Sequence, residues 1–171
     1  MSNAVADQPA IADQPAIADQ PAVTGQPAVE FGHVEHVTVH FDDLDAMGIL
    51  HNARYAVLLE RALTPYWTER GLAYRGSATP PDLFHAVREF TISYRAPIVT
   101  TGPVAVHFWL EHFGASSAEY AFQFRSVDGS TVHAEGRRAI VRLDPATLRP
   151  APWTEAARAV AATLLRPAAV A

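Results

Sequence analysis

Two carboxylates precede a glycine and a polar pair in the stretch FDDLDAMGILHNARY. Asp43 and Asp45 come before Gly48, and His51 and Asn52 then open what the pattern predicts to be the only long helix of the core. A carboxylate at a helix N-terminus can support acyl chemistry, because it can act as base or nucleophile while unpaired N–H groups of the helix hold a developing oxyanion. The same spacing is also typical of an acidic helix cap. Spacing alone leaves both interpretations open.

The composition excludes several other chemistries. The 171 residues contain no cysteine, which removes a thiolate nucleophile and a Cys-based metal site. All thirteen basic residues are arginine, so the chain has no lysine for a Schiff base or a phosphate-binding P-loop. The net charge of -5 argues against nucleic acid as the main partner. No apolar run approaches the roughly 18 residues that span a bilayer, and no secretory signal is visible, so we expect no membrane span and a cytoplasmic protein.

The N-terminal region is a repeat. From Ala6 the chain reads ADQPAI, ADQPAI, ADQPAV and TGQPAV, which ends at Val29. The prolines favour extended backbone, and the few apolar side chains cannot offset the entropy lost on ordering. We therefore expect a disordered tail over residues 1–29, either a spacer or a neutral extension, and a folded domain over residues 30–165.

A strand and a helix surround the two carboxylates. Val37, Val39 and Phe41 alternate with polar residues, which predicts a half-buried first strand. Gly71 is a plausible end for the helix that follows, and Pro65 predicts a kink or an early break inside it. The helix would bury one face made of Tyr55, Leu58, Leu59, Ala62, Leu63 and Tyr66.

Four more strands and a short helix are predicted after a loop at residues 73–82. Arg88 interrupts an alternating apolar pattern in the next strand, Gly136 is a candidate bulge in the last one, and the pair Asp128-Gly129 predicts the hairpin turn before it. The apolar positions expected on one face of the second strand are Phe84, Ala86, Phe90, Ile92 and Tyr94. The other elements are expected at residues 104–110, 120–124, 131–143 and 154–165.

This order of elements predicts an α+β fold, with a five-stranded antiparallel sheet wrapped around one long helix. A single helix cannot cover the inner face of such a sheet. We therefore expect subunit association, as a homodimer that continues the sheet or as a homotetramer.

The motif and the element order resemble the hotdog-fold acyl-CoA thioesterases of the 4-hydroxybenzoyl-CoA thioesterase type. Asp45, Gly48 and Tyr55 match the family's Asp, the Gly three residues on and the Tyr ten residues on. Tyr94 begins the stretch YRAP, which with the later Gly102 is similar to the end of the family's next strand and the turn after it. The resemblance covers roughly residues 34–143 and implies the hotdog fold.

The resemblance also implies a mechanism. Asp45 would be the catalytic carboxylate, and the backbone N–H of Asn52 would hold the thioester carbonyl. A thioester has a good leaving group, so a base or nucleophile and an oxyanion donor suffice, and no cofactor is required. Coenzyme A would be the acyl carrier, with an acyl-carrier protein as the alternative.

Other residues receive weaker assignments. Gly48 and Tyr55 would contact the substrate, and Arg88 and Arg95 would bind its phosphates, although a salt bridge would explain Arg88 equally well. His51 is offset by one from the family's histidine, so it would line the acyl pocket or cap the helix. The remaining assignments are structural: Asp43 in a cap or turn, and Glu60 in an ion pair within the helix. The histidines show no ligand spacing, so we expect no metal.

Two rival functions remain. One is an acyl-binding hotdog protein without catalysis, in which Asp45→Asn would change no turnover. The other is a dehydratase or hydratase, which needs a histidine paired with a carboxylate and would use His51.

Overall fold

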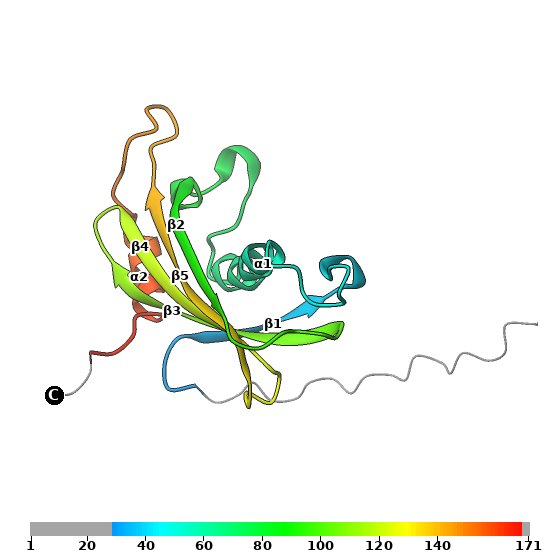
Figure 1. The fold of residues 1–171 in the computed structure, drawn as a ribbon. Coiled ribbons are helices and arrows are strands. Elements are labelled where there is room, and N and C mark those ends of the chain that lie inside the picture. The colour runs from blue at the N-terminus through cyan, green and yellow to red at the C-terminus, as the bar shows by residue number, and fades with distance from the viewer. Residues whose placement is uncertain (1–28, 169–171) are drawn as a thin grey trace, which may run out of the picture.

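The structure, a computed structural model, describes residues 29–168. Figure 1 shows one long helix, α1, lying in the hollow of a curved antiparallel sheet whose strand order is β1-β3-β4-β5-β2. This confirms the predicted α+β class. Apart from Val29, the predicted tail lies outside the described residues. The strands are β1 His33–Val39, β2 His85–Tyr94, β3 Gly102–Phe113, β4 Ser117–Arg125 and β5 Val132–Arg142, and the helices are α1 Arg54–Glu69 and α2 Glu155–Ala162.

The predicted apolar face of α1 is buried along its whole length, from Tyr55 to Tyr66. The helix ends as predicted, because Gly71 takes a left-handed φ of 88° that favours glycine. The predicted break at Pro65 is wrong, since α1 continues to Glu69. Leu63 and Tyr66, on either side of the proline, are both held in the core, so packing keeps this segment helical.

β2 contains a bulge that the sequence pattern did not resolve. Val87 pairs with Ile140 of β5 and Glu89 pairs with Ala139, which leaves Arg88 as the extra residue. The bulge exchanges the two faces of the strand, so the predicted inward positions of Phe84 and Ala86 are wrong. In the first half of β2 it is His85 and Val87 that share the inner face with Phe90, Ile92 and Tyr94.

Two further expectations about strands are wrong. β1 ends at Val39, and Phe41 lies in a short 3-10 turn with 85% of its surface exposed. Gly136 is not a bulge, because its pairing with Ile92 on one side and Phe122 on the other is regular. A Cβ atom at Gly136 would lie 2.1 Å from the backbone oxygen of Thr91. Glycine is needed there for close packing.

Gly136→Ala is therefore expected to destabilise the fold by about 3 kcal/mol, the upper end of the usual cost of overpacking, because the clash is with strand backbone that cannot rotate away. Gly71→Ala is the matched control: nothing lies within 4 Å of its added Cβ, so only the left-handed backbone costs free energy, about 1 kcal/mol. Urea unfolding of the two variants measures the difference. Equal losses would contradict the steric account.

α2 packs against the far end of α1 and the inner face of the sheet. Ala157 and Ala161 are buried in the same core cluster as α1, and the hydroxyl groups of Tyr66 and Thr163 lie 2.5 Å apart. Within residues 29–168, β1 and β2 are the outermost strands of the sheet. Neither helix in residues 29–168 has the length and apolar character needed to cross a membrane.

Candidate active site

Asp45 is held by the turn that it helps to form. Its Oδ1 accepts hydrogen bonds from the backbone N–H groups of Met47 at 2.8 Å and Ile49 at 3.2 Å. The N–H of Gly48, with a φ of 73°, donates to the Asp45 carbonyl at 2.9 Å. Among the described residues no donor reaches Oδ2. Asp45 therefore closes a turn rather than capping α1, and one of its oxygens is free to accept a proton.

The start of α1 carries a free backbone donor. His51 caps the first turn, because its Nδ1 accepts a hydrogen bond from the N–H of Ala53 at 3.2 Å. The N–H of Asn52 has no acceptor in residues 29–168. A free N–H at the positive end of a helix dipole suits a developing negative oxygen.

Asp45 and Asn52 open into one cavity of about 360 Å³ between the turn, the start of α1 and the end of β2. Five predicted site residues meet there, namely Asp45, His51, Asn52, Tyr55 and Arg95. The other two predicted residues do not line this cavity. Gly48 lies in the turn that Asp45 closes, and Arg88 is exposed in the β2 bulge. Ile49, Leu50, Tyr94, Ala96 and Pro97 complete the lining.

Two tyrosines form the wall on the β2 side. The hydroxyl of Tyr94 donates to the carbonyl of Asn52 at 3.4 Å, and its ring packs edge-on against Tyr55 at 5.2 Å. Burial, with a smaller contribution from Tyr94, raises the pKa of Tyr55 to about 12. Tyr55 is thus a neutral phenol at physiological pH. Arg95 forms an ion pair with Glu135 at 2.7 Å, which holds the guanidinium at the rim.

Asp43 has a different role from Asp45. Only 1% of its surface is exposed, and its carboxylate lies 3.3 Å from Arg54 Nε and 3.9 Å from Arg61. It also accepts the N–H of His40 at 2.9 Å. Asp43 therefore ties the end of β1 to the first two turns of α1, in agreement with the structural role predicted for it.

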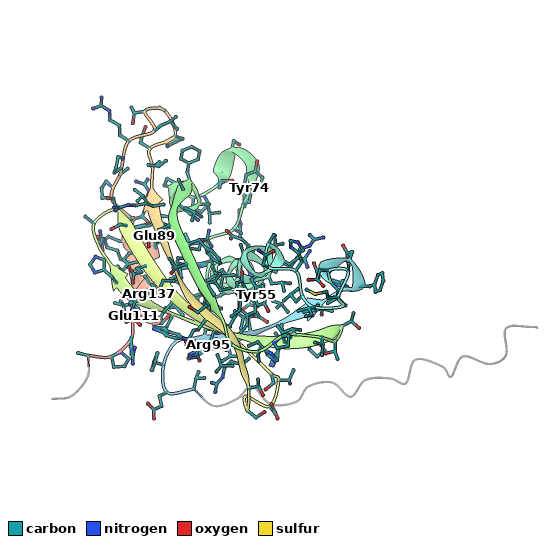
Figure 2. The ribbon with its side chains drawn as sticks, in the orientation of Figure 1. Tyr55, Tyr74, Glu89, Arg95, Glu111 and Arg137 are labelled. Carbon is teal, nitrogen blue, oxygen red and sulfur yellow. The ribbon has the colours of Figure 1, made fainter. Side chains whose placement is uncertain are left out.

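Glu60 does not form the predicted ion pair within α1. It pairs with the buried Arg138 of β5, at 2.5 Å, while the neighbouring Arg61 is directed to Asp43. Arg137 points to the opposite face of β5 and pairs with Glu119. Figure 2 shows Arg137 and Glu111 on the side of the sheet away from Tyr55. Sequence reasoning had no means of assigning Glu60 its partner, since strand register decides which arginine faces inward.

A larger hollow of about 690 Å³ lies on this outer face, but its chemistry is less suited to catalysis. Two of its acids are already in ion pairs: Glu111 with Arg166, and Glu135 with Arg95. Across residues 29–168 no cluster of three or more His, Asp or Glu side chains could hold a metal ion. The cavity at Asp45 is the better candidate.

Comparison with known proteins identifies the family of the chain. The model of the thioesterase-like superfamily matches residues 39–161. The Bacillus subtilis (strain 168) protein YneP, a candidate acyl-CoA thioesterase, is 25% identical over 93 residues, which are 54% of this chain and 67% of YneP.

Solved structures share the fold. A thioesterase from Thermus thermophilus, in complex with coenzyme A and zinc, is 26% identical with a TM-score of 0.64, over 79% of this chain and 96% of that one. The PA5185 protein of Pseudomonas aeruginosa PAO1 is 21% identical with a TM-score of 0.68, over 79% and 92% of the two chains. The family match covers most of the chain, and the protein belongs to the thioesterase-like superfamily of hotdog-fold thioester hydrolases.

Proposed function

We propose that the protein hydrolyses acyl-CoA thioesters. Asp45 either attacks the thioester carbonyl or activates the water that attacks it. The observation that supports this is that a free Asp45 oxygen and the free Asn52 N–H belong to residues that line the same cavity.

The carbonyl oxygen would accept the Asn52 N–H in either of two routes. In the first, Asp45 takes a proton from water, the water oxygen adds to the carbonyl carbon, the C–S bond breaks, and the proton passes to the leaving thiolate. In the second, Asp45 adds to the carbonyl carbon, the C–S bond breaks to release the thiolate and leave an anhydride on Asp45, and water then hydrolyses the anhydride. Both routes release a carboxylic acid and the coenzyme A thiol and restore Asp45.

Coenzyme A as the carrier rests on the relatives. YneP is named for acyl-CoA, and the Thermus thermophilus thioesterase was solved with coenzyme A. Arg95 at the rim would contact the phosphates, whereas Arg88, predicted for the same role, lies away from this cavity in the β2 bulge. An acyl-carrier protein would instead dock its own surface against this rim. Comparing the hydrolysis rates of acyl-CoA and acyl-carrier substrates separates the two carriers.

The site also suggests a second subunit. β2 pairs with β5 on one side only, and its Val87 and Tyr94 are exposed together with Val57 on the flank of α1. A free strand edge beside exposed apolar residues favours pairing with a second copy. We propose a homodimer through β2, which would cover the cavity from the solvent side.

His51 fits a dehydratase poorly. That chemistry needs a histidine paired with a carboxylate, and within residues 29–168 the His51 ring contacts no carboxylate, because its Nδ1 accepts the N–H of Ala53 and the side chain is exposed. His51 therefore acts as the helix cap in our proposal.

Asn52→Pro is expected to lower kcat/KM by about 10²- to 10³-fold, because it removes one oxyanion donor. The substitution breaks no hydrogen bond within the described residues, since the Asn52 N–H has no acceptor there. Asn52→Ala keeps the N–H and should stay within about threefold of wild type. Thiol release from acyl-CoA measures both variants, and circular dichroism checks that the start of α1 is intact. Similar losses in both would point to the side chain and contradict the backbone role.

The function itself is tested by thiol release over a series of acyl-CoA chain types. Hydrolysis of at least one member is the expected result. If the protein bound acyl-CoA but released no thiol from any member of the series, it would be an acyl-binding protein without catalysis.

A further inference from the structure

Three hollows follow one another along α1, and we call them together the α1–β2 groove, because residues of α1 and β2 line each of them. They are the Asp45 cavity, an apolar hollow of about 210 Å³ and a cavity of about 310 Å³, and the last two share Glu60 and Arg138 in their linings. Asn52, Ala56, Glu60 and Thr64 are spaced by four residues, so they follow one side of the helix along this groove. The middle hollow is lined by Ala56, Val57, Glu60, Val87, Phe90 and Arg138.

The end of the groove is built for a carbon chain. The cavity of about 310 Å³ is lined mainly by apolar and aromatic side chains, among them Leu63, Trp67, Tyr74, Tyr120 and Ile140. Such a lining favours apolar ligand surface, with a few polar groups fixing the orientation.

A buried arginine stands at the border between the middle hollow and this cavity. The Arg138 side chain is 5% exposed, and its only partner within residues 29–168 is Glu60, which is 54% exposed. A guanidinium has five N–H donors, so most of them are unused. None of the Arg138 nitrogens is among the fully enclosed unpaired atoms, so the unused donors face the groove.

His85 adds an acceptor to the same cavity. Its Nδ1 lies 3.1 Å from the carbonyl oxygen of Asp82, which can only accept, so Nδ1 carries a hydrogen. Burial lowers the pKa of His85, and the ring is neutral with Nε2 as an acceptor. The cavity thus offers donors from Arg138 and acceptors from Glu60 and His85, with no net charge among the three.

We propose that the preferred substrate carries a neutral hydroxyl group far along its acyl chain, and that Arg138 and Glu60 bind this hydroxyl. A hydroxyl can accept from Arg138 and donate to Glu60. A saturated chain would cover the unused donors of Arg138 with carbon, and a terminal carboxylate would meet the charge of Glu60. This inference rests on the proposed function, because it uses the groove as the path of the acyl chain.

The length of the groove sets the position of the hydroxyl. Eight residues separate Asn52 from Glu60, which is about 12 Å along a helix. A peptide residue has three backbone bonds and spans about 3.5 Å when extended, which is about 1.2 Å per bond. An extended acyl chain advances by a similar amount, so about ten bonds cover this distance. A ten-carbon acyl group with its hydroxyl at the far end matches this distance.

The test compares three acyl-CoA substrates of equal chain length: decanoyl, 10-hydroxydecanoyl and the dicarboxylic decanedioyl. Wild type should show kcat/KM about tenfold or more higher for the hydroxylated chain than for decanoyl, and lowest for decanedioyl. Arg138→Met should bring the first ratio close to one. Arg137→Met, on the opposite face of the same strand, should keep the wild-type ratio. A wild-type ratio near one, or a ratio that survives Arg138→Met, would overturn the proposal.

A second variant tests the charge at the site by substituting an exposed side chain. Glu60→Gln removes the negative charge beside Arg138, so hydrolysis of decanedioyl-CoA should rise about tenfold or more relative to decanoyl-CoA; an unchanged ratio would count against the role of Glu60. The three thioesters are also titrated into Asp45→Asn protein to measure binding. Absence of turnover in wild type would defeat the proposed function, whereas equal binding of the three chains would defeat this inference alone.

Discussion

Asp45→Asn is expected to lower kcat/KM for acyl-CoA by about 10³-fold, within the usual range for loss of a general base. The amide has nearly the shape of the carboxylate, and its oxygen can still accept the N–H groups of Met47 and Ile49. The turn should therefore survive while the proton acceptor is lost. KM should change little, because the Asn52 N–H that holds the carbonyl is untouched.

Asp42→Asn is the matched control. Asp42 is exposed and three residues from Asp45, and the only contact of its carboxylate within residues 29–168 is with Arg54, at 3.7 Å. Its variant should hydrolyse at the wild-type rate and unfold at the wild-type temperature. Thiol release under saturating and subsaturating substrate separates kcat from KM for both proteins. If the Asp45→Asn enzyme kept wild-type kcat/KM, Asp45 would have no catalytic role and the mechanism would have to be abandoned.

The sequence was a good guide where contacts are local. The buried face of α1 follows from helical periodicity, and Asp45 and Asn52 are only seven residues apart, so a single turn brings them into one cavity. The alternation in β2 predicted the wrong inward residues before Arg88. The reason is that the bulge at Arg88 depends on pairing with β5, which the sequence of β2 alone does not show. Gly136 was misread for the same reason: its close contact with Thr91 exists only across two strands.

The far end of the groove could not be predicted from the sequence at all. Arg137 and Arg138 are equivalent until the register of β5 is known, and only then does one of them face Glu60. His85 had no predicted role, and the bulge in β2 places it on the inner face of the sheet with Val87 and Phe90. Long-range strand pairing, and not residue type, decides which side chains line this cavity.

Asp43→Ala is expected to destabilise the fold by about 3 kcal/mol. The side chain is almost fully buried, and its loss removes charge-assisted contacts to Arg54 and Arg61 and leaves the N–H of His40 without its acceptor. Removing one member of a buried ion pair typically costs about 3–5 kcal/mol. The lower end applies because both arginines are partly exposed and can turn to water. Urea unfolding followed by circular dichroism measures the loss.

Asp42→Ala sets the scale for this comparison, because an exposed carboxylate should cost about 0.5 kcal/mol or less. Asp43→Asn adds a further distinction: the amide oxygen can keep the His40 N–H, so this variant should recover part of the loss but not the ion pairs. The Asp43 variants should retain turnover per folded molecule within about tenfold, since their effect on Asp45 passes only through the position of α1. A stable Asp43→Ala protein with no activity would reverse the assignment and make Asp43 the reactive carboxylate.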